Sequence, residues 1–375
     1  MEISELNRLV SENSGRYVAF DNDKPSLVVF DAKKYQHLVT KEVGSGKKIL
    51  VTGGLGYIGS HAVADLLDHE REVVVFDNLS AGDISSVNCP VIIGDLLNKD
   101  QIEKVFDHYN IEAVIHFAGS IMVGESVEDP NKYYLNNVAG TLNLLDAMMR
   151  HGVNRIVFSS SAAVYGNPET KVISETHPCN PTSPYGETKL MVEKILQRYS
   201  AAYGLSSVSF RYFNAAGATM DRNLGETHPV ETHLIPRALM VANKEAEIFN
   251  VFGFDYPTPD GTAVRDYVHV RDIARAHVLA LDKLAAETGT FVYNIGTGKG
   301  LSVAQVIDKV VEITRRMVTI ERSPRRPGDP ATLVADCKKI QTELNFVPEH
   351  SAIENIIQTA WDWHRANAIR RAILK

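Results

Sequence analysis

Three side chains in the middle of the chain have the types and the spacing needed for proton transfer. Tyr185 and Lys189 are four residues apart in a segment with helical periodicity, so they lie on one helix face. A free tyrosine has a pKa of about 10 and is a poor base at neutral pH, but a nearby ammonium group favours its phenolate. Ser161 ends a run of serines and can hydrogen-bond a substrate hydroxyl that loses its proton. The same Tyr and Lys spacing also occurs in ordinary surface pairs, so the prediction depends on the surrounding fold.

The elements that position these side chains are expected to begin at a glycine-rich turn. The apolar run Ile49 to Val51 is typical of a strand buried on both faces, and a helical apolar pattern follows from Ile58. Between them, Gly53 can make a tight turn, Gly56 can let the backbone approach a pyrophosphate, and Gly59 can let the helix pack on the strand. The phosphates would then lie at a helix N-terminus, where free amides and the helix dipole favour negative charge.

A second predicted strand, from Glu72 to Asp77, ends in a carboxylate. A carboxylate at this place can accept hydrogen bonds from both hydroxyls of an adenosine ribose, and it would repel a 2′-phosphate. The sequence therefore favours NAD over NADP. The structural alternative is an aspartate that stabilises a turn before Asn78.

Composition and charge exclude several functional classes. The length of 375 residues predicts roughly two to three domains, and the hydrophobic fraction of 44% is ample for their cores. The net charge of −7 is modest and both signs are interspersed, so no nucleic-acid partner is expected. We expect no membrane partner either, because no apolar run approaches a bilayer span and the N-terminus is too polar for a signal peptide. Cys89, Cys179 and Cys337 are few and widely spaced, which indicates reduced thiols in a cytoplasmic protein and no metal site.

Strands and helices alternate after the glycine turn. The expected strands are Val91 to Ile93, Ala113 to Phe117 and Arg155 to Ser159, with helices near residues 101–109 and 133–149 between them. This order predicts an α/β protein with a Rossmann-type, doubly wound parallel sheet and a smaller C-terminal α/β domain. Ligands on such sheets lie at the carboxyl ends of the strands. The polar or small residues expected at those ends are Asp77, Asp95, Ala118, Gly119 and Ser159.

Several short motifs carry a resemblance to a known family. They are Thr52 to Gly59, Phe76 to Leu79, His116 to Gly119, Val123 to Ser126, Phe158 to Ala162, Pro184 to Gly186, Arg211 to Asn214, Val264 to Val270 and Arg325 to Asp329. On these motifs the chain resembles the extended short-chain dehydrogenase/reductase superfamily from about residue 48 to the C-terminus, and most closely its UDP-glucose 4-epimerase family. The resemblance implies reversible 4-epimerisation of UDP-galactose and UDP-glucose through a 4-keto sugar, with tightly held NAD, in a homodimer.

The resemblance also implies roles for individual residues, with Tyr185 as the acid and base, Lys189 as its partner and Ser161 as the hydroxyl-bonding serine. The implied NAD-binding residues are Gly53, Gly56, Tyr57, Ile58, Gly59, Asp77, Asn78, Asp95, Leu96, Phe117, Ala118, Gly119, Asn136, Ser159, Tyr185, Lys189 and Phe213. The implied UDP-sugar-binding residues are Ser161, Tyr185, Asn214, His233, Leu234, Val251, Phe252, Arg265, Arg326, Asp329 and Leu333.

Some positions depart from the family pattern. Ile121 stands where some members have a lysine near the NAD phosphates, and Ala163 stands where a threonine is frequent. His233 replaces a frequent asparagine beside the nucleotide. Leu333 is of intermediate size at the position that gates the substituent on C2 of the sugar, so tolerance of N-acetylated sugars stays open.

Three alternative functions remain to be weighed. Epimerisation of UDP-N-acetylglucosamine or UDP-glucuronate needs only a pocket that tolerates another substituent, which costs few kcal/mol. A 4,6-dehydratase would need an additional acid and base where the chain has Ala162 and Ala163. A non-catalytic dinucleotide-sensing protein would be expected to lack Ser161, Tyr185 or Lys189, and all three are present.

The expected domains are a NAD-binding domain at residues 48–211 and a UDP-sugar-binding domain at residues 212–375, interleaved around residues 265–295. Residues 1–40 form an appendage with a predicted helix, hairpin and helix, followed by a polar linker at residues 41–47. The appendage is too small to bury much surface alone, so we expect it to pack on the body or to pair with its own copy. It also resembles the N-terminal part of the Phd/YefM antitoxin family in its Lys-Pro turn and tyrosine-containing helix.

Overall fold

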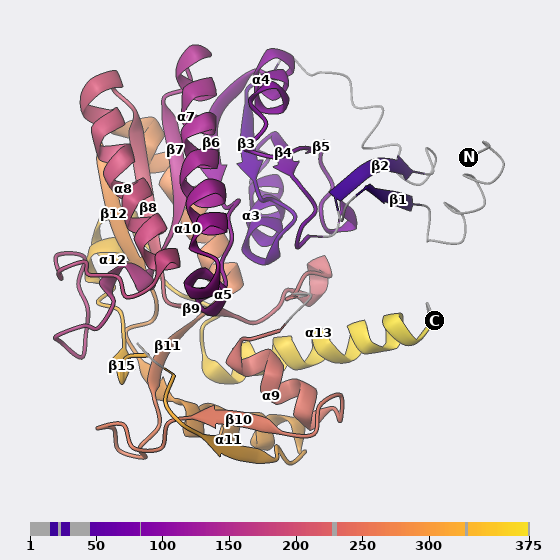
Figure 1. The fold of residues 1–375 in the computed structure, drawn as a ribbon, viewed down its shortest axis with the longest axis vertical. Helices are drawn as coiled ribbons and strands as arrows, with labels where there is room; N and C mark the ends of the chain where they lie inside the picture. The colour runs from indigo at the N-terminus through magenta and orange to yellow at the C-terminus, as the bar shows by residue number, and fades with distance from the viewer. Residues whose placement is uncertain are drawn as a thin grey trace.

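A parallel seven-stranded sheet forms the centre of the computed structural model, which describes residues 16–21, 24–30, 46–82, 84–226, 231–326 and 329–373. Its spatial order is β12-β8-β7-β6-β3-β4-β5, and all neighbouring strands are parallel (Figure 1). The strands are β3 (Lys48–Thr52), β4 (Val73–Asp77), β5 (Val91–Ile93), β6 (Ile111–His116), β7 (Arg155–Ser161), β8 (Ser206–Tyr212) and β12 (Thr290–Ile295). The order reverses between β3 and β6, which is where ligands bind in doubly wound folds.

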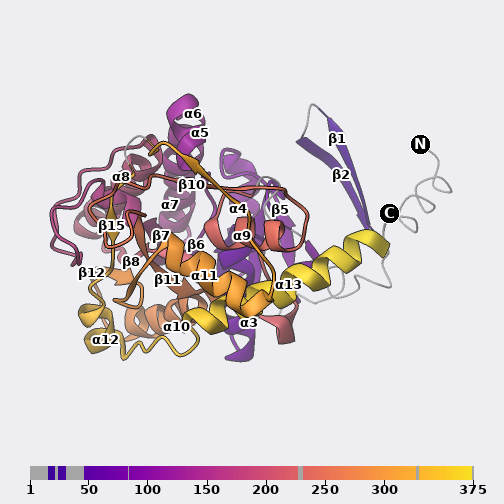
Figure 2. The same cartoon turned by 90° about the horizontal axis from the view of Figure 1, so that it is seen from below.

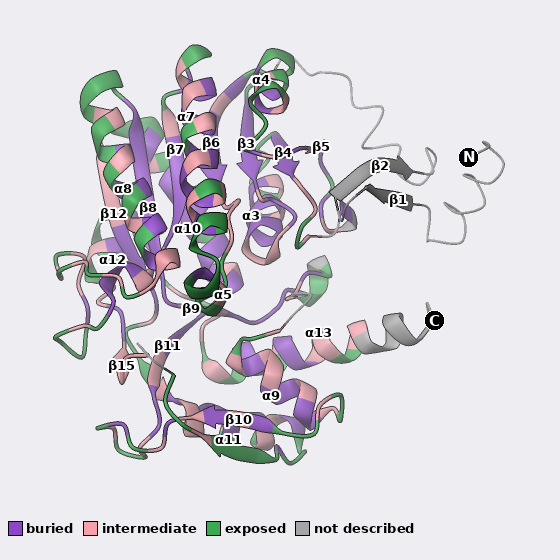
Figure 3. Ribbon diagram, viewed as in Figure 1, coloured by how far each residue is buried: buried purple, intermediate pink, exposed green. Residues whose placement is uncertain are grey.

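Helices cover both faces of this sheet, as Figure 2 shows. The first face carries α3 (Tyr57–Asp68), α10 (Val270–Ala286) and α12 (Lys338–Leu344), and the second carries α4 (Lys99–His108), α7 (Gly140–Arg150) and α8 (Pro184–Tyr203). Because helices lie on both sides, the inner strands are buried along most of their length (Figure 3). The predicted α/β fold with a doubly wound parallel sheet is therefore confirmed.

Local sequence signals determine where the site-bearing helix α8 begins and ends. Ser183 occupies the N-cap and its hydroxyl accepts a hydrogen bond from the Gly186 amide at 3.2 Å, while Pro184 takes the first helical position. The helix ends at Gly204, which has the left-handed conformation with φ of 71°. These signals place Tyr185 in the first turn, directly beyond the sheet.

A smaller α/β unit lies below the sheet in Figure 1. In it β11 (Val264–His269) is central and pairs with β9 (Asn214–Ala216), β13 (Gly300–Ser302) and β15 (Thr332–Leu333), while β10 (Phe249–Phe252) pairs with β14 (Ile320–Ser323). Its helices are α9 (Leu234–Ala242), α11 (Val303–Thr314) and α13 (Ile353–Ile373), which share a separate apolar core. The chain returns to the large sheet with α10 and β12, and once more with α12, which packs in the core of the first face.

The segment predicted as one helix over residues 133–149 is broken into several pieces. It consists of the end of α6 (Pro130–Tyr133), a π-helical segment η2 (Tyr134–Ala139) and α7, and the short helix α5 (Val123–Glu128) precedes them. A π-helical turn inserts one residue into the helix, so the side chains on either side of it face different directions than a regular helix would give. Short 3-10 helices are η1 (Ile84–Ser86), η3 (Ala162–Tyr165) and η4 (Met220–Arg222).

The N-terminal region contains the antiparallel pair β1 (Arg16–Asp21) and β2 (Lys24–Phe30), close to the two strands that the sequence suggests there. The helices expected on either side of this pair fall outside the described residues. No helix in the described part of the chain has the length together with the apolar content that a bilayer crossing requires.

Candidate active site

The glycine turn joins β3 to α3 and has the tight packing that its spacing predicts. Gly53 has a φ of +69°, and a Cβ atom there would lie 2.5 Å from the amide nitrogen of Ala118. A Cβ on Gly59 would lie 2.2 Å from the carbonyl oxygen of Gly53, so the helix contacts the turn directly. At Gly56, the N-cap of α3, a Cβ would meet only the Gly53 oxygen at 3.4 Å. The first turn of α3 carries no acidic residue, so its free amides face no competing carboxylate on their own helix.

Asp77 lies beside this turn and is bonded to it. Its carboxylate accepts hydrogen bonds from the amides of Leu55 at 3.0 Å and Leu79 at 2.8 Å. Burial raises the pKa of Asp77, and these two backbone bonds oppose that rise. Each carboxylate oxygen keeps a further lone pair, so Asp77 can accept ribose hydroxyls while it holds the turn.

The other residues predicted to line a dinucleotide lie at the carboxyl ends of neighbouring strands or in the loops that follow them. Asp95 and Leu96 follow β5, Phe117 to Gly119 follow β6, Ser159 lies in β7 two residues before its end, and Phe213 follows β8. Tyr57 and Ile58 begin α3, and the Tyr57 hydroxyl donates to the carbonyl of Gly217 at 2.6 Å. Asn78 follows Asp77, and its side-chain oxygen accepts from the Ser80 amide at 3.1 Å. Ile121 is 43% exposed.

Ser161, Tyr185 and Lys189 are brought together at the end of β7 and the start of α8. Tyr185 shares a side-chain hydrogen bond with Ser161, and the Lys189 ammonium is 5.8 Å from the centre of the Tyr185 ring. The Ser161 hydroxyl also accepts from the Ala163 amide at 3.1 Å, which fixes its rotamer. The Lys189 ammonium donates to the carbonyl of Ser159 at 2.8 Å. The structure therefore brings Ser161, Tyr185 and Lys189 together, with the Lys189 ammonium beside the Tyr185 ring.

The electrostatics at this triad differ in one respect from the sequence-based expectation. Burial raises the pKa of Tyr185 and the hydrogen bond with Ser161 opposes this rise, whereas the lowering expected from Lys189 is not found. Burial also lowers the pKa of Lys189 to about 8. The titratable groups that face Tyr185 from other elements are Tyr133 of α6 and Tyr212 of β8.

The π-helical segment contributes side chains that the periodicity did not reveal. Asn137 accepts from the Ser120 amide at 2.7 Å and donates to the Ser120 carbonyl at 3.0 Å and the Thr188 hydroxyl at 3.1 Å. It therefore ties the loop after β6 to α8, one residue before Lys189. The neighbouring Asn136, which was predicted to line NAD, donates to the Ser120 hydroxyl at 2.9 Å.

In the smaller unit, the predicted substrate residues lie on β9, β10 and β15, on β11 itself, in the segment that precedes β15 and at the start of α9. Arg265 donates to the Asp329 carboxylate, and Leu333 pairs with Arg265 across β11 and β15. The Arg326 guanidinium lies over the Phe252 ring at 3.9 Å from its centre, and Val251 precedes Phe252 in β10. Asn214 begins β9 and pairs with Tyr267 of β11.

His233 lies at the N-cap of α9, directly before Leu234, and contacts two carboxylates. Its Nδ1 is 2.5 Å from Glu226 and 3.3 Å from Glu231. Burial lowers the pKa of His233, but the hydrogen bonds with the two glutamates outweigh it and raise the pKa to about 10. The imidazole is therefore cationic at neutral pH, although it remains half-exposed. The ligand atoms of these three residues lie within 4.8 Å of one another, and the protonated histidine itself supplies the cation between the two carboxylates.

The comparisons with known proteins agree with this geometry. Residues 49–296 match the NAD dependent epimerase/dehydratase family. The UDP-glucose 4-epimerase of Corynebacterium glutamicum is 49% identical over 317 residues, which cover 84% of this chain and 94% of the relative. The crystal structure of UDP-glucose 4-epimerase from Brucella ovis in complex with NAD has a TM-score of 0.82 at 46% identity, with 84% of this chain and 98% of that chain covered. The UDP-glucose 4-epimerase from Bifidobacterium longum in complex with NAD+ and UDP has a TM-score of 0.82 at 39% identity, with 86% and 99% covered.

Proposed function

Since the chain belongs to the NAD dependent epimerase/dehydratase family, we propose that it interconverts UDP-glucose and UDP-galactose by inverting C4 of the sugar with bound NAD. The observation that carries this proposal is the contact between Ser161, Tyr185 and Lys189 at the strand ends of a dinucleotide fold. These groups can exchange a proton with one hydroxyl of a substrate.

The residues of the glycine turn fit the cofactor. The turn leaves no room for side chains at Gly53 and Gly59, while Gly56 stays open toward the start of α3, where a diphosphate would accept backbone amides. Asp77 would accept the adenosine ribose hydroxyls, and the residues after β5, β6 and β8 would line the remainder. When bound, NAD supplies the acceptor and later the donor of the C4 hydrogen.

The chain's own residues move the proton. Tyr185 takes the proton of the C4 hydroxyl, and Ser161 hydrogen-bonds the same oxygen and orients it. Lys189 stabilises the negative charge that Tyr185 carries before the transfer. The resulting 4-keto sugar turns about its diphosphate linkage and presents its other face, and Tyr185 returns the proton to give the inverted centre. No net oxidation occurs.

The smaller unit would hold the UDP group. Arg265 and Arg326 offer paired donors for the diphosphate oxygens, and Asp329 suits a ribose hydroxyl. Asn214, Leu234 and Val251 are proposed to complete the pocket wall, with Leu333 at the C2 substituent. His233 stands where the family commonly has a neutral asparagine, and its pairing with Glu226 and Glu231 would change the contact to the nucleotide at this position.

We place the enzyme in the cytoplasm as a homodimer. The free thiols of Cys89, Cys179 and Cys337 suit a reducing compartment. The homodimer follows from the family resemblance and is tested by the molar mass in solution.

The direct test is turnover by the purified protein. Incubation with UDP-galactose, with and without added NAD, is expected to yield UDP-glucose, read by chromatography of the UDP-sugars. Failure with NAD present would exclude the proposed reaction. A panel that adds UDP-N-acetylgalactosamine and UDP-galacturonate identifies the substrate range that Leu333 permits, and faster turnover of either would assign the enzyme to that sugar instead.

The role of Tyr185 is tested by Tyr185→Phe. We expect kcat to fall by about 10²- to 10⁴-fold, because the variant has no group that can take the C4 proton. Bound NAD, measured by its absorbance after denaturation of the protein, is expected to remain. Tyr203→Phe is the matched control, because Tyr203 lies on the same helix and is 64% exposed. Equal turnover in both variants would contradict the assignment.

A further inference from the structure

Three consecutive residues at the end of β7 are bonded to three residues of α8 that are spaced by four. Ser161 shares a hydrogen bond with Tyr185, and the Ser159 carbonyl accepts from the Lys189 ammonium at 2.8 Å. The third contact joins the Ser160 hydroxyl to the Glu193 carboxylate at 2.5 Å. Residues four apart share one face of a helix, so the three contacts together fix both the rotation of α8 and its position along its axis.

The third contact is polar at a place where an apolar one would be expected. Along β7, Ile156 and Phe158 point into the apolar core beneath α8, and Ser160 continues the same alternation. Glu193 is likewise flanked by the apolar core residues Val192 and Leu196 on α8. A serine and a glutamate thus meet beside apolar core residues of both elements.

Arg211 of β8 neutralises the buried glutamate. Its guanidinium donates to Glu193 through two nitrogens, at 2.6 Å and 3.0 Å, in the bidentate geometry of strong carboxylate pairs. Glu193 is 2% exposed and Arg211 is 5% exposed. Burial lowers the pKa of Arg211, but the hydrogen bond and the charge of Glu193 outweigh this effect and the pKa is raised. A buried pair of this kind adds little net stability compared with apolar side chains, because both charges lose their hydration.

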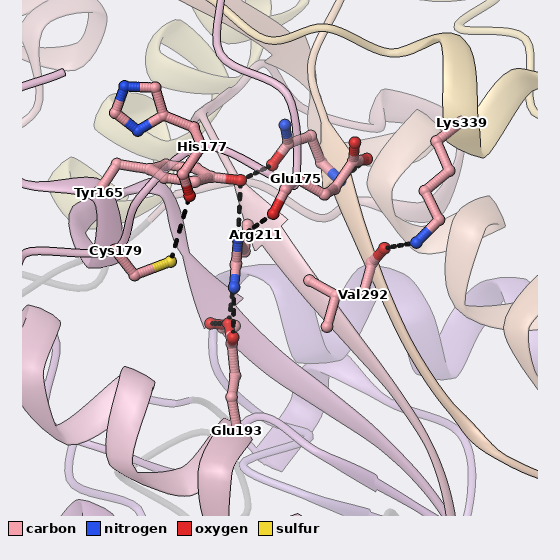
Figure 4. Close-up of polar contacts among 10 residues, drawn as sticks. Tyr165, Glu175, His177, Cys179, Glu193, Arg211, Val292 and Lys339 are labelled. Carbon is pink, nitrogen blue, oxygen red and sulfur yellow. Dashed lines mark hydrogen bonds and ion pairs between the residues drawn. The ribbon is translucent and has the colours of Figure 1, made fainter. Parts of the chain in front are cut away.

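Another donor of Arg211 bonds to the segment that follows Ser161 in the chain. Figure 4 shows Arg211 between Glu193 and the pair of Tyr165 and Glu175. Its Nη1 donates to the Tyr165 hydroxyl at 2.9 Å, and Tyr165 in turn donates to the Asn294 side chain of β12 at 2.6 Å. Tyr165 ends η3, the short helix that begins directly after Ser161. The network therefore holds the chain both immediately before and shortly after Ser161.

We propose that Glu193 and Arg211, acting through Ser160, form a positioning unit that sets the distance between the Tyr185 hydroxyl and Ser161. The proposal rests on the epimerase function proposed above. The pair does not contact the substrate site itself, so its effect on turnover passes through the placement of α8 against β7. The competing explanation is a pair that serves only the stability of the core.

The two explanations predict different kinetics for Ser160→Ala. This substitution removes the hydroxyl that bonds to Glu193 and leaves the ion pair of Glu193 and Arg211 in place. A positioning role predicts that kcat for UDP-galactose falls by about tenfold or more with an unchanged KM, because small displacements of catalytic groups are costly. It also predicts that the acid limb of the profile of kcat against pH moves to higher pH. The reason is that the hydrogen bond with Ser161 lowers the pKa of Tyr185, and a weaker bond lets that pKa rise.

Glu193→Gln is the second variant, because it keeps the shape of the side chain and removes the charge opposite Arg211. It is expected to move kcat and the pH profile in the same direction as Ser160→Ala. Ser207→Ala is the matched control: Ser207 is a fully buried serine of β8 whose hydroxyl has no hydrogen-bond partner among the described residues. The control is expected to leave kcat, KM and the pH profile unchanged.

These measurements distinguish the positioning role of Glu193 and Arg211 from the epimerase function on which it rests. A wild-type protein that does not convert UDP-galactose overturns the epimerase function, whatever the variants do. An active wild type with a Ser160→Ala variant of equal kcat and equal pH profile overturns the positioning role, even if its melting temperature is lower. If Glu193→Gln does not fold, Ser160→Ala alone decides the question, because it leaves both charges paired.

Discussion

The buried ammonium of Lys189 lies beside Tyr185, where the proposed chemistry needs a positive charge. Burying that charge lowers the stability of the folded protein. Lys189 is 3% exposed, and burial lowers its pKa from 10.5 to about 8. Between these two values the unfolded chain binds more protons than the folded protein, so the free energy of unfolding rises with pH. Below about pH 8 the cost is constant, and the shift corresponds to about 3 kcal/mol.

We therefore predict that Lys189→Met loses turnover and yet gains stability. At pH 7 the free energy of unfolding, measured with urea, is expected to increase by about 1–3 kcal/mol, since the lost hydrogen bond to Ser159 offsets part of the relief. At pH 10 the difference from the wild type is expected to shrink. Lys194→Met, at an exposed position of the same helix, is the control. A Lys189→Met variant that is less stable at both pH values would show that the ammonium stabilises the fold.

Asp77 has two roles that an experiment can separate. It holds the glycine turn by hydrogen bonds, and it is proposed to select NAD over NADP. Its carboxylate holds the amides of Leu55 and Leu79, so any substitution loosens the turn for every dinucleotide alike. Only the selective effect depends on the 2′ position, where the negative charge would repel a phosphate. We predict that Asp77→Ser weakens NAD binding by about 10- to 100-fold. The ratio of the dissociation constants of NADP and NAD, measured by fluorescence titration, is expected to fall, and an unchanged ratio would assign Asp77 to the turn alone.

At the scale of elements, the turn between β3 and α3 allows two glycines to be compared. A Cβ on Gly59 would lie 2.2 Å from a backbone oxygen that cannot move without displacing the helix, whereas a Cβ on Gly56 meets only ordinary contacts. Gly56 also has an extended backbone that alanine adopts readily, with φ of −70° and ψ of 174°. A side chain at position 59 would therefore strain the protein even without cofactor, whereas one at position 56 would interfere only with bound NAD.

We predict that Gly59→Ala lowers the stability of the protein without cofactor by more than about 2 kcal/mol, as overpacking against rigid backbone does. Gly56→Ala is expected to leave that stability within about 0.5 kcal/mol and to weaken NAD binding. Thermal unfolding with and without NAD measures both effects. If Gly56→Ala binds NAD as tightly as the wild type, the pyrophosphate does not approach this glycine.

The strands and the helices around them were predictable because each signal was local. An apolar run predicted β3, and the Tyr185 to Lys189 spacing predicted a shared helix face. The π-helical segment was not predictable, because one inserted residue does not disturb the apolar pattern of residues 133–149. Its consequence, the placement of Asn137 against Ser120 and Thr188, was therefore missed.

Electrostatic interactions between residues far apart in the sequence were the second feature that the sequence analysis did not predict. Glu193 lies four residues after Lys189, which was a usable signal, but an acid on a helix is expected in solvent unless its partner is known. That partner, Arg211, comes from another strand. Likewise the sequence shows the charge near Tyr185 but not the burial that raises its pKa, because burial is a property of the packed layers.

At the scale of the whole molecule, the proposed site is contained in the part of the chain that resembles known epimerases. The residues proposed for NAD, for proton transfer and for UDP lie between Gly53 and Leu333. The Brucella ovis structure is matched over 98% of its own length by only 84% of this chain. In the described residues, β1 and β2 pair with each other and with no strand of the larger sheets.

We therefore predict that removal of residues 1–45 leaves kcat and KM for UDP-galactose unchanged. The physical reason is that, among the described strands, the truncation removes only β1 and β2, which pair with each other, and leaves the sheets and apolar clusters around the site intact. Molar mass from light scattering, measured on both proteins at equal concentration, then tests what the appendage does. An unchanged dimer would place the dimer contact in the epimerase body, whereas a monomer that still turns over would assign pairing to the appendage. A truncated protein that folds but has lost its activity would show that the N-terminal residues complete the site, against the containment argued here.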